Sequence, residues 1–194
     1  MNKKEHKKAL AKIKKEKVFN LAELTELFGN RMEVCRKARA GIIQSLGSGY
    51  YASPKLDPFL ATLRVVMKYY PEVVISGRTA LHIHGLSQDY IEQIDVDIKR
   101  EKSLRNKLLK VHRVPSSRYV GITQISYQGI KIKIYDTERT LAEAYRLDPA
   151  GPDFYKALKR YIKKGNIKSD QIAHNDKILK TKVMTHLQQE LAND

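Results

Sequence analysis

The sequence predicts an α+β protein, in which a small N-terminal domain of helices and a β-hairpin precedes a mixed α/β domain that ends in helices. Two observations support this prediction. Capped helical segments and a glycine turn between β-rich segments occupy the chain up to residue 52. Beyond residue 57, helical and strand patterns intermix until about residue 135, and only helical patterns follow. Because residues 53–58 interrupt both patterns, we expect domains at residues 1–53 and 57–194.

The composition is that of a basic globular protein. Its 37 Lys and Arg residues outnumber 21 Asp and Glu residues, and the net charge of +16 favours a polyanionic partner, either nucleic acid or an anionic membrane surface. The single cysteine, Cys35, excludes an internal disulfide and a cysteine cluster for zinc. There is neither an export signal nor an apolar run of membrane-spanning length, so we expect a cytoplasmic protein.

Residues 1–17 predict a solvated amphipathic helix with eight Lys against two Glu. Its apolar stripe consists of Leu10 and Ile13, which is too thin to insert into lipid, so we expect no membrane partner. The same charges would attract the phosphates of a nucleic acid. The residues assigned to this role are Lys12, Lys14 and Lys15.

Two short capped helices follow. Asn20 and Asn30 each have a glutamate three residues later, the spacing of a capping box, and Gly29 and Gly41 end the two helices. β-rich segments at residues 42–46 and 50–52 then flank the Gly-Ser-Gly turn. Helix, turn, helix and hairpin is the order of a winged helix-turn-helix, a DNA-binding module.

The second helix of this module is the candidate recognition helix. On a helical wheel Val34, Cys35, Ala38 and Ile42 share the sector that should face the core, and the charged residues lie opposite. We expect Arg36 to reach a guanine edge, because its planar fork suits one. Ordinary solvated charge is the alternative explanation. The residues expected to contact DNA are Asn30, Arg31, Met32, Glu33, Arg36, Lys37, Arg39, Ser48 and Gly49.

The α/β part of the second domain should run to about residue 135, with helices beyond it. The expected elements are a helix from Pro58 capped by Asp57, a strand at 73–75, a short helix at 79–84, a strand at 94–98, a hairpin at 122–134, and helices after Asp136, after Pro152 and from about Asp176.

An enzymatic alternative lies in the same domain. A glycine turn at residues 76–77 follows a strand, Asp95 and Asp97 lie on a later strand, and Asp136 ends a third. This order is typical of metal-dependent nucleotidyltransferases, in which a glycine turn holds triphosphate and carboxylates hold the metal. Against it, Arg78 stands where a second small residue is expected, and Asp136 serves equally well as a helix cap.

No other catalytic or metal site is predicted. His82 and His84 are two residues apart, a spacing that points them in different directions on a helix. Cys35 belongs to the inward sector of its helix, so no nucleophile is in evidence. We therefore expect no cofactor and no enzymatic activity of this chain.

The chain resembles the AbiEi family of antitoxins and transcriptional repressors in abortive-infection toxin–antitoxin systems. Four stretches in the family's order carry the resemblance: the N-terminal winged helix with residues 47–52, then residues 75–86, 127–141 and 157–161. The third is the most specific. The basic N-terminus is a departure from the family pattern.

The resemblance implies a repressor that binds double-stranded DNA at repeats in its own promoter. It also implies that the C-terminal domain counters a co-transcribed, nucleotidyltransferase-like toxin without forming a stable complex, so that the neighbouring protein is the enzyme. Arg78, His84 and Arg139 lie in the family-like stretches, where we expect packing roles.

Overall fold

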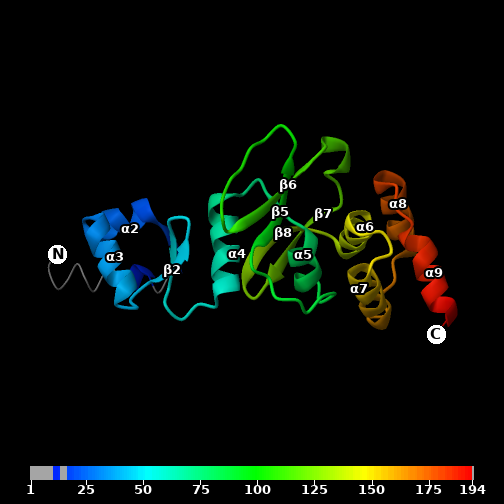
Figure 1. Cartoon of the computed structure of the whole chain (residues 1–194), viewed down its shortest axis with the longest axis horizontal. Coiled ribbons are helices and arrows are strands. Elements are labelled where there is room, and N and C mark those ends of the chain that lie inside the picture. Colours follow the sequence, from blue (N-terminus) through cyan, green and yellow to red (C-terminus); the bar gives the residue numbers. More distant parts are fainter. Residues whose placement is uncertain (1–10, 14–16, 194) are drawn as a thin grey trace. The chain divides into compact units, whose positions relative to one another are not determined.

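The computed structural model describes residues 11–13 and 17–193. The chain divides into two compact units (Figure 1). Unit 1 comprises Met1–Pro71 and Asn106–Leu108, and unit 2 comprises Glu72–Arg105 and Leu109–Asp194. Each unit contains its own β-sheet together with helices, so the predicted α+β class is confirmed.

Unit 1 contains a short antiparallel sheet with the strand order β1-β3-β2. Its described elements are β1 (Val18–Asn20), α2 (Leu21–Phe28), α3 (Arg31–Arg39), β2 (Gln44–Gly47), β3 (Tyr50–Ala52) and α4 (Pro58–Tyr69). The sequence did not predict β1, because three residues are too few to show a strand periodicity. Residues 11–13 are helical, as expected, but Lys17 is not, because it has φ of 69° directly before β1. The remaining residues of the predicted N-terminal helix, 1–10 and 14–16, lie outside the described residues.

The first helix of the predicted second domain belongs to unit 1. Ala61 and Val65 of α4 pack with Val18 and Ala52 in one buried cluster, and the Lys68 ammonium donates to the Val18 carbonyl oxygen at 3.2 Å. The division therefore follows Pro71 and not residues 53–57. Because α4 packs against the small sheet, the interrupted pattern at residues 53–58 marks a turn inside unit 1 and not a domain boundary.

Unit 2 contains a five-stranded mixed sheet with the order β6-β5-β4-β8-β7. The pairs β4/β8 and β5/β6 are parallel, and β4/β5 and β7/β8 are antiparallel. The elements are β4 (Val74–Ile75), α5 (Gly77–Ile83), β5 (Ile94–Lys99), β6 (Leu109–Val114), the 3₁₀ turn η1 (Ser116–Arg118), β7 (Ile122–Tyr127), β8 (Ile130–Tyr135), α6 (Thr137–Leu147), α7 (Pro152–Lys163), α8 (Ser169–Leu179) and α9 (Val183–Asn193).

The expected hairpin in this sheet is confirmed. Ile122 pairs with Tyr135 at one end and Tyr127 with Ile130 at the other, and the turn at residues 128–129 has φ of 48° and 71°. Strand β6 was not predicted. It is an edge strand whose burial does not alternate, so its residues show no period of two.

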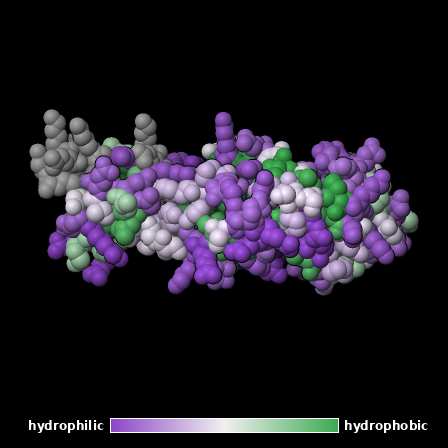
Figure 2. Space-filling view, turned by 90° about the horizontal axis from the view of Figure 1, so that it is seen from above, coloured by the Kyte–Doolittle hydropathy of each residue, from purple (hydrophilic) through white to green (hydrophobic). Residues whose placement is uncertain are grey.

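Helices α6–α9 lie together beside the sheet (Figure 1) and share one apolar core. Leu141, Phe154, Leu158, Ile172 and Leu187 are among its fully buried side chains. In Figure 2 hydrophilic residues cover most of the visible face, and hydrophobic residues form smaller patches between them. Within the described residues, no helix is both long and apolar enough to cross a membrane.

The prediction of one last helix from about Asp176 is wrong. Two helices meet there, because Lys180 adopts a left-handed conformation with φ of 57° and ends α8. The Asp176 carboxylate accepts hydrogen bonds from the backbone N–H groups of Val183 at 3.1 Å and Met184 at 2.9 Å. It also accepts the Thr181 hydroxyl hydrogen bond. Asp176 thus lies in α8 and caps the start of α9.

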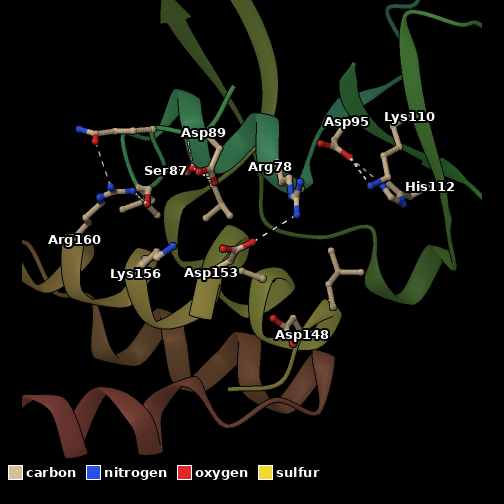
Figure 3. A pocket seen from close by; sticks show the side chains of 16 residues that line it. Arg78, Ser87, Asp89, Asp95, Lys110, His112, Asp148, Asp153, Lys156 and Arg160 are labelled. Atoms are coloured by element: carbon tan, nitrogen blue, oxygen red, sulfur yellow. Dashed lines mark hydrogen bonds and ion pairs between the residues drawn. The ribbon is translucent and has the colours of Figure 1, made fainter. Parts of the chain in front are cut away.

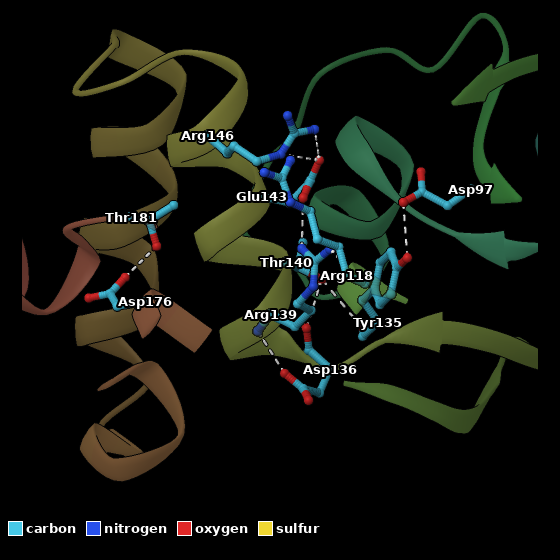
Figure 4. Close-up of polar contacts among 10 residues, drawn as sticks. All are labelled: Asp97, Arg118, Tyr135, Asp136, Arg139, Thr140, Glu143, Arg146, Asp176 and Thr181. Atoms are coloured by element: carbon cyan, nitrogen blue, oxygen red, sulfur yellow. Dashed lines mark hydrogen bonds and ion pairs between the residues drawn. The ribbon is translucent and has the colours of Figure 1, made fainter. Parts of the chain in front are cut away.

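A buried ionic network joins the sheet to α6 (Figure 4). Arg139 is 0% exposed, and its guanidinium donates to the Glu143 carboxylate at 2.7 Å and to the Arg118 carbonyl oxygen at 3.2 Å. The same guanidinium lies 4.4 Å from the ring centre of Tyr135. Arg146 donates to the other oxygen of Glu143 at 3.0 Å. Arg139 therefore has the packing role expected for it.

His84 also packs as expected, whereas Arg78 does not. The His84 Nε2 bonds to the Tyr135 carbonyl oxygen at 2.7 Å, and burial lowers the pKa of His84. Arg78 has a side chain that is 65% exposed, and it lines a cavity. The packing role predicted for Arg78 is therefore wrong, because Arg78 lies at the start of α5, where the chain leaves the sheet.

Candidate nucleic-acid interface

Asparagine caps begin both α2 and α3. The Asn20 side chain accepts from the Glu23 N–H at 2.9 Å, and the Glu23 carboxylate accepts from the Asn20 N–H at 2.9 Å. The Asn30 side chain accepts from the Glu33 N–H, also at 2.9 Å. Between the helices, Gly29 has φ of 91°, a conformation that favours glycine. The predicted caps are thereby confirmed.

Helix α3 buries the face that the helical wheel predicted. Val34 is fully buried in a cluster with Phe19, Leu24 and Phe28, and Cys35 is half-buried. These apolar contacts fix the rotation of α3 about its own axis. The opposite face is consequently held toward solvent.

The outward face of α3 is basic. Arg31, Arg36 and Arg39 are exposed, and Met32 is 66% exposed between them. Lys37 is only half-buried and so less outward than expected, because the chain turns back beside it, with the Ile42 N–H donating to the Lys37 carbonyl oxygen at 2.9 Å. We name the exposed residues of α3 the basic face, which consists of Arg31, Met32, Arg36 and Arg39.

One acidic residue, Glu33, reduces the positive charge of this face. The Glu33 carboxylate accepts from the Arg36 guanidinium at 2.7 Å, and the two side chains are 31% and 71% exposed. Such an exposed pair is weak, so the guanidinium can leave it for a stronger partner. Glu33 therefore positions Arg36 and does not neutralise it permanently.

The hairpin carries the other predicted contacts. Ser48 and Gly49 are exposed at its tip, with φ of 51° and 77°. A Cβ on Gly49 would lie 3.9 Å from the Leu21 Cβ, which puts the tip beside the start of α2. The tip and the basic face thus lie on different elements of unit 1, and the tip lies beside α2.

Charge concentrates in unit 1. Its residues include 16 Lys or Arg and 6 Asp or Glu, which gives +10 of the total of +16. Lys12 is exposed in the described helical turn, while Lys14 and Lys15 lie outside the described residues. A field of this strength attracts a polyanion over a distance of about a Debye length, roughly 8 Å at physiological salt.

The carboxylates of the enzymatic alternative are each engaged by neighbours in unit 2. Asp95 accepts from His112 Nε2 at 3.1 Å, and Asp97 accepts from the Tyr135 hydroxyl at 3.0 Å. Asp136 caps α6, as the sequence also allowed. Across residues 11–13 and 17–193, no group of three or more His, Cys, Asp or Glu side chains could hold a metal ion. Nucleotidyl transfer stays a prediction, now without a three-carboxylate metal cluster to support it.

Burial changes the acid–base properties of these groups. It raises the pKa of Asp97, which is 2% exposed, and the pKa of Asp136. The hydrogen bond to Asp95 raises the pKa of His112. His112 therefore carries more positive charge near neutral pH than a free histidine does.

Sequence reasoning missed one group of charged residues altogether. A cavity in unit 2 is lined by His112 of β6 and by Lys156 and Arg160 of α7. Lys156 and Arg160 stand four residues apart, which does place them on one face of a helix. Helix packing decides which face of α7 lines a cavity. The spacing of residues in the sequence does not predict that face.

Neither a protein-family model nor a curated protein matches this chain. Among solved structures, the chain is similar to the RV2827C protein from Mycobacterium tuberculosis. The TM-score is 0.61 at 13% sequence identity, over 91% of this chain and 72% of that chain. At this identity the similarity concerns the fold alone, and it supports a mixed α+β architecture across both units.

Proposed function

We propose that this chain is a DNA-binding transcriptional regulator whose unit 1 is a winged helix-turn-helix. The observation that carries the proposal is the basic face of α3, turned outward by the burial of Val34 on the other side. In this reading α3 is the recognition helix and the β2–β3 hairpin is the wing. The +10 charge of unit 1 supplies the sequence-independent attraction to phosphates.

Individual residues have distinct roles in this proposal. Arg36, in the middle of the basic face, donates to a guanine edge in the major groove. Arg31 and Arg39, nearer the two ends of α3, bind the flanking phosphates. Ser48 and Gly49 are slim enough for the hairpin tip to approach the DNA backbone.

The resemblance to the AbiEi family extends the proposal to a biological role. The chain would act in the cytoplasm, repress its own operon from repeats in the promoter, and counter a co-transcribed toxin without a stable complex. This role needs no catalysis by the chain itself.

The test is a fluorescence anisotropy titration of the full chain. The probe is DNA from upstream of its own gene, and scrambled DNA of equal length is the competitor at two salt concentrations. We expect promoter DNA to bind more tightly at both. Arg36→Ala should weaken promoter binding about tenfold or more and relax discrimination at one base position.

Two further variants make the test specific. Arg39→Ala should weaken binding to promoter and scrambled DNA alike, as loss of a phosphate contact does. Lys177→Ala removes the same charge from an exposed site on α8 and should change neither. Equal, salt-labile binding of both DNAs, or unchanged discrimination in Arg36→Ala, would contradict the assignment of α3 as the recognition helix.

A further inference from the structure

Unit 2 contains a cavity of about 470 Å³ that the DNA-binding proposal does not use (Figure 3). It lies between the start of α5, the 86–89 loop, the β5–β6 edge, the end of α6 and one face of α7. This volume is in the range of small-molecule sites. All of its lining residues belong to unit 2, so one compact unit builds the whole site.

Two cations on α7 face the cavity without a carboxylate partner. The Arg160 guanidinium donates to the Leu86 carbonyl oxygen at 3.0 Å and to the Gln88 side-chain oxygen at 3.4 Å, which hold it in place and leave its charge. The Lys156 ammonium makes no hydrogen bond or ion pair with any described residue. Like charges four residues apart on a helix repel each other, and an anion bound between them would relieve that repulsion.

A third cation, Arg78, also lines the cavity. The Arg78 guanidinium lies 3.6 Å from the Asp153 carboxylate, a separation longer than a hydrogen bond, and both side chains are at least half exposed. Figure 3 shows Arg78 opposite Asp153 and between the α7 cations and Asp95. Arg78 can turn to an incoming anion at little cost.

The rest of the lining is not that of a simple anion site. Leu81, Leu86 and Leu147 supply apolar surface, and Leu147 is 54% exposed. Asp89 and Asp148 supply hydrogen-bond acceptors. On the far wall, Lys110 and His112 flank Asp95, with Nζ and Nε2 at 3.9 Å and 3.1 Å from its oxygen.

We propose that this cavity binds a nucleotide. The phosphate groups bind Lys156, Arg160 and Arg78, the base packs on the apolar lining, and the sugar hydroxyls donate to the aspartates. A bare anion would leave the leucines and acceptors unused, and a neutral metabolite would leave the α7 cations unpaired. The proposal concerns unit 2 and stands independently of DNA binding by unit 1.

The experiment is isothermal titration calorimetry on the full chain in EDTA at physiological salt. The probes are the four ribonucleoside monophosphates, the four triphosphates and sodium phosphate. We expect saturable binding of at least one nucleotide and markedly weaker binding of sodium phosphate. Lys156→Gln should weaken nucleotide binding about tenfold, the loss expected for one charge-assisted hydrogen bond.

Matched variants separate the cavity from the general basicity of the chain. Lys163→Gln makes the same change on an exposed position of α7 outside the cavity, and it should leave nucleotide affinity unchanged. Arg36→Gln alters the basic face of α3 and should also leave it unchanged. The proposal is overturned if no nucleotide binds saturably, if phosphate binds as tightly as the nucleotides, or if Lys163→Gln or Arg36→Gln weakens binding as much as Lys156→Gln.

Discussion

The buried ion pair between Arg139 and Glu143 makes a strong prediction about stability. Glu143→Gln keeps the shape of the side chain and removes its charge. Arg139, which is 0% exposed, then keeps only the Arg118 carbonyl oxygen and the Tyr135 ring as partners for its own charge. Removing one member of a buried pair usually costs 3–5 kcal/mol, because the other charge is left uncompensated. Glutamine still accepts one hydrogen bond, so we expect a loss of about 3 kcal/mol.

Urea unfolding followed by circular dichroism measures this loss. With an m-value of about 2 kcal/mol per molar urea, the midpoint should fall by about 1.5 M. Glu101→Gln, on an exposed loop of the same unit, is the control and should change stability by less than about 0.5 kcal/mol. Replacing both charges, with Arg139→Met and Glu143→Leu together, should cost less than Glu143→Gln alone. A loss in Glu143→Gln no larger than that of the control would refute the reasoning.

The same pair predicts a pH dependence. Burial opposes ionisation of Glu143, but hydrogen bonds from Arg146 and Arg139 outweigh it and lower the pKa of Glu143 below its ordinary value of 4.5. A carboxyl whose pKa is lower in the folded state stabilises the fold above its unfolded pKa and loses that contribution as the pH falls. The stability difference between the parent chain and Glu143→Gln should thus be largest near neutral pH and shrink as the pH drops below about 4.5.

Two further predictions concern other parts of the chain. Asp176→Ala removes the cap of α9 and should destabilise unit 2 by about 1–2 kcal/mol, whereas Asp170→Ala, exposed at the start of α8, should have little effect; equal midpoints in urea for the two variants would contradict the cap. Glu33→Gln releases Arg36 from its exposed ion pair and should tighten binding to promoter and scrambled DNA alike, by roughly twofold to fivefold in the anisotropy titration. Weaker binding in that variant would contradict this role and would favour the DNA contact that the sequence predicted for Glu33.

Local chemistry allowed the sequence to predict much of unit 1. The Asn20 and Asn30 caps, the Gly29 turn and the inward position of Val34 depend on residues within a few positions of one another. Such interactions need no distant partner, so spacing alone predicts them. The basic face of α3 follows, because the residues opposite a buried stripe must face solvent.

Long-range packing decided the features that the sequence missed. Strand β1 exists because β3 offers it a pairing edge, and α4 joins unit 1 because its apolar face meets Val18 and Ala52. The break at Lys180 is held by the Asp176 carboxylate, which bonds residues on the next helix. These contacts outweigh local propensity, which is why the fourfold spacing from Asp176 predicted one continuous helix.

The two candidate sites, the basic face of α3 and the cavity of unit 2, differ in the same way. The sequence by itself determined the net charge of +16, which is a sum over residues. It also determined the residues of the α3 face, because a single helix carries all of them. Only the tertiary structure gathered Arg78, His112 and Lys156 around one cavity, from α5, β6 and α7. Side chains that are far apart in the sequence converge only when the sheet and helices pack, and periodicity along the chain carries no record of that convergence.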